Sequence, residues 1–403
     1  MKIVVYEHLT GGGYAQQPFS ANVLAEGFAM LRCVAADFKA AGHEVTVLLD
    51  QRISKLNLPL NADYIVPVAY SHEPAFFLSD VAKINDALFL IAPETDGTLQ
   101  KLVALVEKTG KTSLNCTSKS IGQVSDKTVL YGQLEKNGIS TPKTAVLNNA
   151  ETLEFIRHTI EESFFYPVVF KPIDGTGCGG VSLVCSNVEI GKAIDKIKSQ
   201  TRQNKFIVQE YLTGESASVS VLCNGKYAQA VSLNKQTVNL NAPFTDSCYL
   251  GGTVPIEHHL KHEAFSAAER VVKLFSGLRG YVGVDVILTE NKVYILDLNP
   301  RLTTSYVGLT EVSEKNAGKA LIDAATNGQY SEFKVSGVSC FGKLQSNSPS
   351  MEAFYKMCNE TVVSPLFPFT TSAVALLRGC GSNLREATRR LEEAKKSLRS
   401  IMC

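Results

Sequence analysis

The sequence lacks the features of several specialised protein classes. Its 403 residues include no tryptophan, an absence that carries no functional information. No apolar run reaches the roughly 18 residues that a membrane-spanning helix needs, and the opening residues MKIVVYEHLTGGG lack the long apolar region of a signal peptide. Forty Lys and Arg balance 39 Asp and Glu, so overall charge attracts neither nucleic acid nor an anionic membrane. We therefore expect a cytoplasmic protein without a membrane or nucleic-acid partner.

The ten cysteines are scattered along the chain, and no two of them form a C-x-x-C pair. Closely spaced cysteines are the usual sign of a zinc site or a redox pair. Their scattered positions favour free thiols in a reducing compartment.

The amino-terminal part predicts a parallel sheet. The chain is long enough for two or three domains of about 100 to 200 residues each. In residues 1–115, apolar strand-like runs alternate with helical stretches, with strands expected at 3–6, 45–50, 64–68 and 87–93 and helices at 22–41 and 98–108. This alternation is typical of an α/β sheet covered by helices.

Ligands of such sheets bind at the carboxyl ends of the strands. There the sequence places Thr10, Gly11, Gly12 and Gly13 after the first strand and Glu94 after the fourth. The triple glycine lacks the GxGxxG spacing of a dinucleotide site. A pocket of backbone amides for a substrate carboxylate is the favoured interpretation.

The remainder predicts an α+β region. A helix capped by Asp126 is expected to run from Lys127 to Lys136, and strands dominate residues 142–299, with helices near 150–161, 186–199 and 260–277. The final part, about 330–403, has a strand at 373–379 and an amphipathic helix. Its apolar positions are expected to pack on the core: Leu384, Ala387, Leu391 and Leu398.

A glycine-rich loop follows a strand that carries a lysine near its end, in the segment FKPIDGTGCGG at 170–180. Four glycines in six residues let backbone N–H groups surround phosphate oxygens, and Lys171 adds a positive charge. Because a strand follows the loop, it is not a Walker A motif. The pattern predicts a phosphate site; a flexible hairpin is the alternative.

Two acidic residues are expected to face each other in a hairpin. The strands 281–288 and 292–299 flank a turn at 290–292, and centring the hairpin on residue 291 places Asp285 opposite Asp297. Asn299 projects from the same face as Asp297. Three hard oxygen ligands on one rigid face suit Mg²⁺ or Mn²⁺. The alternative is a chance pair of surface acids.

The residues after this hairpin add an anion-binding group. Arg301 follows Pro300, and a guanidinium beside a metal–phosphate site can bind a phosphoryl oxygen or a carboxylate. The hydroxyls of Thr303, Thr304 and Ser305 can orient the same group. Earlier in the chain, the buried strand 206–210 emerges into a polar turn, whose backbone can meet an adenine edge and whose Glu215 can accept from a ribose hydroxyl.

The order of these motifs over about residues 1–310 resembles the ATP-grasp superfamily. The matching segments are a helix-leading Asp126-Lys127, the Lys171-Pro172 strand with its glycine loop, the hinge 209–212 followed by Gly214-Glu215, and the paired-acid hairpin ending in Asn299-Pro300-Arg301. The resemblance implies an α/β and α+β protein with the ATP-grasp fold and an N-terminal parallel-sheet domain, Rossmann-like and termed pre-ATP-grasp.

The resemblance also implies domains and roles. The domains would be a substrate-side domain at 1–115, a central lid subdomain at 116–205, a C-terminal subdomain with the metal site at 206–330, and an extension at 331–403 packed on the core. Asp285, Asp297 and Asn299 would hold two Mg²⁺ ions, although the superfamily usually has Glu where this chain has Asp297. The residues implied to bind ATP are Lys127, Lys171, Asp174, Gly175, Thr176, Gly177, Cys178, Gly179, Gly180, Gln209, Glu210, Tyr211, Leu212 and Glu215.

Within the superfamily, three segments look similar to the ligases that join tyramine to L-glutamate in methanofuran biosynthesis. They are 6–13, 24–31 and 298–306. The pyrrolysine-pathway ligase is a more distant relative. By resemblance the chain would form an amide from a carboxylate, ATP and an amine through an acyl phosphate, with small-molecule partners. The oligomeric state, including a homodimer, stays open.

In this scheme Lys171 neutralises charge on the transferred phosphoryl group, and Arg301 and Lys235 border the acyl phosphate. Thr10 to Gly13, Glu94 and the hydroxyls at 303–305 help to bind substrates. Two rival hypotheses remain: an ATP-binding regulator without ligase activity, and a dinucleotide oxidoreductase built on the amino-terminal sheet.

Overall fold

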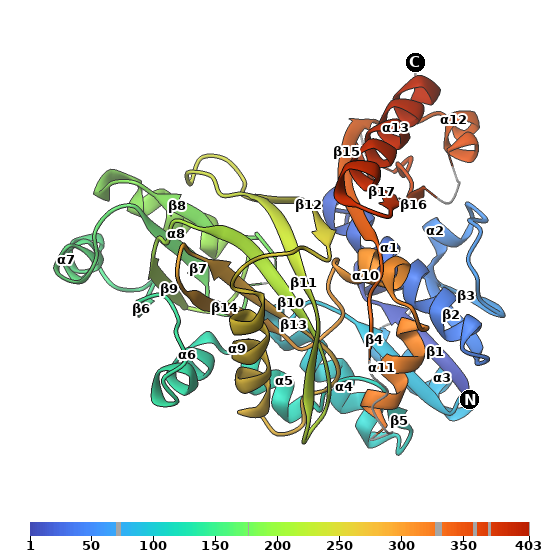
Figure 1. Ribbon diagram of the computed structural model, residues 1–403, viewed down its shortest axis with the longest axis horizontal. Helices are drawn as coiled ribbons and strands as arrows, with labels where there is room; N and C mark the ends of the chain where they lie inside the picture. Colours follow the sequence, from blue (N-terminus) through green and yellow to red (C-terminus); the bar gives the residue numbers. More distant parts are fainter. Residues whose placement is uncertain (70–73, 176, 327–332, 358–360, 370–371, 403) are drawn as a thin grey trace.

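The computed structural model describes residues 1–69, 74–175, 177–326, 333–357, 361–369 and 372–402. Its strands form three sheets of five, eight and four strands. In Figure 1 the four-stranded sheet lies at the left, the eight-stranded sheet crosses the middle, and the five-stranded sheet lies at the right. No helix in the described ranges is both long and apolar enough to cross a membrane.

The five-stranded sheet is parallel, as predicted, with the order β3-β2-β1-β4-β5. Every residue of β4 is buried, because helices cover both faces of the sheet. The predicted strand at 64–68 and helix at 98–108 coincide with β3 and α4. The elements are β1 (Lys2–Glu7), η1 (Leu9–Gly13), α1 (Ala21–Ala40), β2 (Glu44–Asp50), α2 (Gln51–Ser54), β3 (Tyr64–Val68), α3 (Pro74–Lys83), β4 (Ala87–Ile91), η2 (Thr95–Gly97), α4 (Thr98–Lys108), β5 (Thr112–Ser113) and α5 (Ser118–Ser125).

The four-stranded sheet is antiparallel, in the order β6-β9-β7-β8, and has its own apolar core, in which Phe170 stacks on Phe206. Its strand β9 ends at Glu210, whereas the end of the lid subdomain was predicted at residue 205. Its elements, with the helix α6 that precedes it, are α6 (Lys127–Lys136), β6 (Thr144–Asn148), α7 (Leu153–Ser163), β7 (Val168–Pro172), β8 (Ser182–Val184), η3 (Asn187–Glu189), α8 (Ile190–Lys198) and β9 (Lys205–Glu210).

The eight-stranded sheet is antiparallel, in the order β14-β13-β10-β11-β12-β15-β17-β16. The strands of the C-terminal part continue this sheet, because β15 pairs with β12. The elements are β10 (Glu215–Asn224), β11 (Ala228–Asn239), β12 (Cys248–Val254), α9 (Lys261–Lys273), β13 (Arg279–Leu288), β14 (Val293–Asn299), α10 (Tyr306–Val312), α11 (Ala317–Ala325), β15 (Val338–Asn347), α12 (Met351–Lys356), β16 (Val362–Ser364), β17 (Ser372–Gly381) and α13 (Leu384–Met402).

The C-terminal elements also pack on the amino-terminal domain. Phe367 makes an edge contact with Phe28 of α1, and the Arg32 guanidinium donates to the Val362 carbonyl at 2.8 Å. Helix α13 buries Ala387, Leu391 and Leu398 as predicted. Leu384 was predicted wrongly: it begins the helix, beyond the face that meets β17, and is 56% exposed.

Candidate active site

The β13–β14 hairpin places the two predicted acids opposite each other. Asp285 pairs with Asp297 across the strands. Closer to the turn, Leu288 pairs with Val293, so this end of the hairpin is not centred on residue 291. A bulge between these two stretches restores the register. The predicted acid pair is therefore confirmed, although a bulge produces it and not a regular ladder.

Helix α6 supports this bulge and supplies a lysine. The Tyr131 hydroxyl donates to the Leu296 carbonyl at 2.6 Å. The Asp126 side chain caps the helix by accepting from the Thr128 amide. At the first helical position, the nearly buried Lys127 places its ammonium 2.6 Å from the Asp297 carboxylate. The cap thus fixes the start of α6, and Lys127 at this first position points its side chain towards the acid pair.

Asp285 is held by two amides. The side chains of Asn299 and Gln236 each donate to it at 2.9 Å. Burial raises the pKa of Asp285, and the nearby Asp297 carboxylate raises it further. A divalent cation would relieve this repulsion, and carboxylate and amide oxygens are the ligands that Mg²⁺ and Mn²⁺ prefer. The residues present therefore fit such an ion.

Lys171 lies near the same acids without a partner of its own. Its ammonium makes no hydrogen bond or ion pair with any residue in the described part of the chain. Burial lowers its pKa to about 8, while the charge of Asp297 opposes this shift and that of Lys127 adds to it. An unpaired, largely buried ammonium is costly unless an anion joins it. It is a candidate phosphate contact.

The glycine loop connects β7 to β8, as the sequence predicts. A Cβ at Gly180 would lie 2.7 Å from Pro172, and its φ of +73° also requires glycine. Gly177 has φ of +61° and open space around it. Gly175, Cys178 and Gly179 complete the described part of the loop, whereas Thr176 lies outside the described residues.

Asp174 anchors the base of this loop. Its carboxylate accepts from the Thr201 hydroxyl and from the Asp96 amide, both at 2.8 Å. Both oxygens are therefore engaged by the protein itself. The residue is placed to hold the loop against the amino-terminal domain.

The hinge residues 209–212 lie where the chain passes from the four-stranded sheet to β10. Gln209 is 1% exposed and donates to the Thr144 hydroxyl at 2.8 Å. The Glu210 carboxylate accepts a hydrogen bond from the Lys143 amide at 2.7 Å, so the Glu210 side chain points towards the start of β6. Tyr211 is 42% exposed, and Leu212 is half-buried. The hinge is thus buried at Gln209 and becomes exposed at Tyr211.

Lys235 lies 3.8 Å from Glu215, on the adjacent strand. Gln236, its neighbour, contacts Asp285. Since successive strand residues point to opposite faces, Lys235 faces away from the acid pair. The structure therefore joins Lys235 to the predicted ribose ligand and not to Arg301.

Arg301 meets Glu94, although 207 positions separate them. Its Nε donates to both carboxylate oxygens, at 3.0 and 3.1 Å, and the two side chains are 10% and 6% exposed. Its Nη1 donates to the Leu302 carbonyl, whereas Nη2 makes no hydrogen bond with a described residue. One edge of the guanidinium thus stays available to an anion.

The three hydroxyls after Arg301 connect it to the surrounding elements. Thr303 pairs with the Tyr281 hydroxyl at 2.8 Å, Thr304 donates to Glu26 at 2.7 Å, and Ser305 lies 3.3 Å from the Ser218 hydroxyl. Gly283 makes room for this loop, because a Cβ there would lie 2.4 Å from a methyl group of Thr303. The loop therefore contacts both the eight-stranded sheet and α1.

The triple-glycine segment already binds a carboxylate of the chain itself. The amides of Leu9 and Thr10 donate to Glu7, at 3.2 and 2.7 Å, and the Gly13 amide donates to the His8 carbonyl. Thr10 is fully buried. These bonds engage the amides of Thr10 and Gly13. Gly11 and Gly12 are buried as well, whereas Gly13 is half-buried.

Four residues near the site were not predicted from the sequence: Glu26, Gln236, Tyr131 and Lys343. Glu26 and Lys343 form an ion pair of 2.6 Å across 317 positions. Gln236 is the neighbour of Lys235 in the sequence. Because successive residues of a strand point to opposite faces, strand alternation was the signal by which Gln236 could have been predicted to face the acidic hairpin. No local pattern distinguishes Lys343 from other strand lysines.

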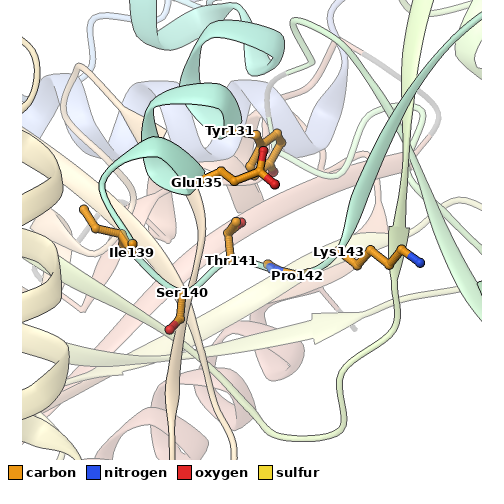
Figure 2. Close-up of a pocket in the computed structure, with 8 residues that line it drawn as sticks. Tyr131, Glu135, Ile139, Ser140, Thr141, Pro142 and Lys143 are labelled. Atoms are coloured by element: carbon orange, nitrogen blue, oxygen red, sulfur yellow. The ribbon is translucent and has the colours of Figure 1, made fainter. Parts of the chain in front are cut away.

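A cleft of about 300 Å³ lies beside the hinge and is shown in Figure 2. Its lining runs from Tyr131 and Glu135 on α6 to the segment 138–143. It shares Tyr131 with the support of the bulge but contains none of the predicted metal or phosphate ligands. We therefore assign the chemistry to the residues around Asp285 and Lys171 and not to this cleft.

Comparisons with known proteins agree with this geometry. Residues 124–305 match the ATP-grasp domain family, and residues 43–121 match the pre ATP-grasp 3 domain. A tyramine–L-glutamate ligase of Methanocaldococcus fervens is 30% identical, over 83% of this chain and 97% of its own. A D-alanine–D-alanine ligase of Fusobacterium nucleatum is 29% identical over 57% of this chain and 72% of its own. The fold is shared with biotin carboxylase of Campylobacter jejuni, at a TM-score of 0.72 and 15% identity over 98% of this chain and 90% of that one.

The fold and the site define an ATP-dependent carboxylate–amine ligase. The chain belongs to the ATP-grasp family.

Proposed function

We propose that this ligase joins L-glutamate to tyramine, or to a closely similar amine, in the biosynthesis of a methanofuran-type cofactor. The observation that carries the proposal is the 30% identity to a tyramine–L-glutamate ligase over 97% of that relative. The match covers 339 residues, 83% of this chain. We further propose a cytoplasmic location.

The proposed reaction has two steps. A carboxylate oxygen attacks the γ-phosphorus of ATP, which releases ADP and forms an acyl phosphate. The amine nitrogen then attacks the acyl carbon, loses a proton and expels phosphate to give the amide. Most of the catalytic effect comes from position and charge, since neither step needs a protein nucleophile.

Each part of the site has a role in this proposal. Lys171 and Lys127 bind phosphate oxygens, and the glycine loop covers them, which excludes water from the acyl phosphate. The hinge at 210–212 presents backbone to adenine, and Glu215 binds ribose. Arg301 offers its free edge to the carboxylate that is activated. Asp285, Asp297 and Asn299 would hold Mg²⁺ or Mn²⁺, which neutralises phosphate charge when bound.

The test is ADP release with Mg²⁺ across a matrix of amino acids and amines, with the mass of each product. We expect release that needs both L-glutamate and tyramine and a product of their summed mass less water. Release with two amino acids would instead favour a dipeptide-forming ligase, which the similarity to D-alanine–D-alanine ligase supports. ATP binding without release under any pair would leave a nucleotide-binding regulator. Light scattering of the same preparation determines whether the chain forms a homodimer.

A further inference from the structure

A second, partly buried ion pair links α1 to the C-terminal part of the chain, next to the loop that carries Arg301: the Glu26 side chain is 25% exposed. Lys343 on β15 is 6% exposed, and its ammonium lies 2.6 Å from one oxygen of Glu26 on α1. The other oxygen of Glu26 accepts from the Thr304 hydroxyl at 2.7 Å. Lys343 also donates to the Asn22 side chain at 3.3 Å. One positive and one negative group are thus held next to each other by three separate segments.

Glu26 is hydrogen-bonded to the loop that carries Arg301, the proposed activation residue. Thr304 belongs to the loop that carries Arg301, and the Glu26 charge acts on Arg301 together with those of Glu94 and Asp285. Tyr249 connects the two regions: the Lys343 ammonium lies 5.9 Å from the centre of its ring. Burial raises the pKa of Tyr249, and the charges of Glu26 and Asp285 raise it further. Tyr249 and Arg301 are thus within electrostatic reach of both Glu26 and Asp285.

Stability alone is a weak reason for such a pair. Removing two charges from water costs about as much as their attraction returns, so apolar residues hold elements together equally well. The junction of α1 with the C-terminal strands already has apolar contacts and the Arg32 bond to Val362. The charges of Glu26 and Lys343 are better explained by a ligand that carries both signs.

We propose that Lys343 and Glu26 bind the α-carboxylate and the α-ammonium group of the amino-acid substrate. This inference rests on the proposed function and extends it to a named subsite. An amino acid bound here supplies one negative and one positive charge, so that each member of the ion pair gains a second partner of opposite charge. The side-chain carboxylate of L-glutamate then extends towards Arg301 for activation.

This subsite predicts how the enzyme selects its acid. The compound 4-aminobutyrate equals L-glutamate without its α-carboxylate, and glutarate equals it without its α-ammonium group. Both keep the carboxylate that reacts. The wild-type enzyme is expected to prefer L-glutamate over each analogue by about 30-fold in kcat/KM, because one charged hydrogen bond is lost in each case.

The decisive experiment compares the three acids with Lys343→Met and Glu26→Gln. Lys343→Met should raise the KM for L-glutamate by about 30-fold and abolish the preference over 4-aminobutyrate, with the KM for ATP unchanged. Glu26→Gln should abolish the preference over glutarate. The control is Lys356→Met, which removes a 2.6 Å ion pair with Glu352 from the surface of α12 and should leave every parameter unchanged.

Two further measurements separate recognition from folding. The double variant Glu26→Gln, Lys343→Met leaves neither charge unpaired and should fold, as thermal unfolding will show, yet bind L-glutamate weakly in calorimetry with MgADP present. Lys343→Arg should restore part of the affinity. Folded single variants that keep the wild-type preference among the acids would overturn the inference while the ligase reaction stands.

A wild-type enzyme that ignores L-glutamate but releases ADP with another amino acid would overturn the glutamate proposal alone. The same variants would then be tested with that amino acid and its analogues lacking either α group. A wild-type enzyme that neither binds nor consumes any amino acid would overturn both proposals.

Discussion

At the scale of single residues, the site gathers positive charge around two acids that repel each other. Lys127 neutralises Asp297 at 2.6 Å, whereas Lys171 has no partner among the described residues. Asp285 is held by amides, which donate hydrogen bonds without adding charge. The arrangement is therefore incomplete as it stands, and a nucleotide phosphate with a divalent cation supplies the charges that it lacks.

Lys171→Met should lower kcat/KM for ATP by about 100- to 1000-fold, since a preorganised charge at the phosphoryl group is lost. Steady-state ADP release at saturating amino acid and amine measures this effect. Lys235→Ala serves as the matched control. Its half-exposed ion pair with Glu215 should cost no more than about fivefold. If Lys235→Ala lowered kcat/KM for ATP as much as Lys171→Met does, Lys235 would have to be regarded as a catalytic residue.

At the scale of elements, α1 is the connection between the amino-terminal domain and the rest of the chain. Asp37 near its end accepts hydrogen bonds from the hydroxyls of Tyr306 and Thr310 on α10. Burial raises the pKa of Asp37 to about 6, from an ordinary value of 3.8. The folded protein thus holds this proton at a higher pH than the unfolded chain does.

This difference gives a pH-dependent stability with a defined sign. The contribution of Asp37 is fully present below about pH 4 and is lost as the pH rises through about 6, a change on the order of 3 kcal/mol. Asp37→Asn should remove this dependence. The free energy of unfolding of the variant should therefore rise relative to that of wild type between pH 4 and 6. Urea unfolding at several pH values measures the two curves. Parallel curves would show that Asp37 has an ordinary pKa.

At the scale of the whole molecule, the C-terminal part belongs to the central sheet. β15 supplies the hydrogen-bonding partner of β12, and Phe341, Phe354 and Phe367 share one apolar core with β1 and α1. In Figure 1, α13 and β15 to β17 lie above α1. The extension is therefore a structural part of the ligase.

A chain shortened to residue 330 should not form a stable fold, because it exposes the edge of β12 and the apolar face of α1. Expression followed by thermal unfolding and size-exclusion chromatography would show aggregation or the loss of a cooperative transition. A soluble, monomeric product with the wild-type unfolding temperature would contradict this expectation.

The sequence by itself determined the local patterns. Short apolar runs alternating with helical stretches and helix caps predicted the parallel sheet, α4, α6 and the antiparallel hairpin, because these depend on neighbouring residues. The position of the turn predicted Asp285 opposite Asp297, and the structure reaches this pairing through a bulge. The glycine loop was equally readable, since positive φ angles and close approach to Pro172 require glycine locally.

Only the tertiary structure decided which distant residues meet. The Arg301–Glu94 contact spans 207 positions and the Lys343–Glu26 contact spans 317, and no local pattern specifies either. The structure also showed that the Leu9 and Thr10 amides serve Glu7 and that Lys235 faces Glu215. Such contacts depend on how the sheets and α1 pack together, because a side chain acquires its partner only when separate elements are brought to one place.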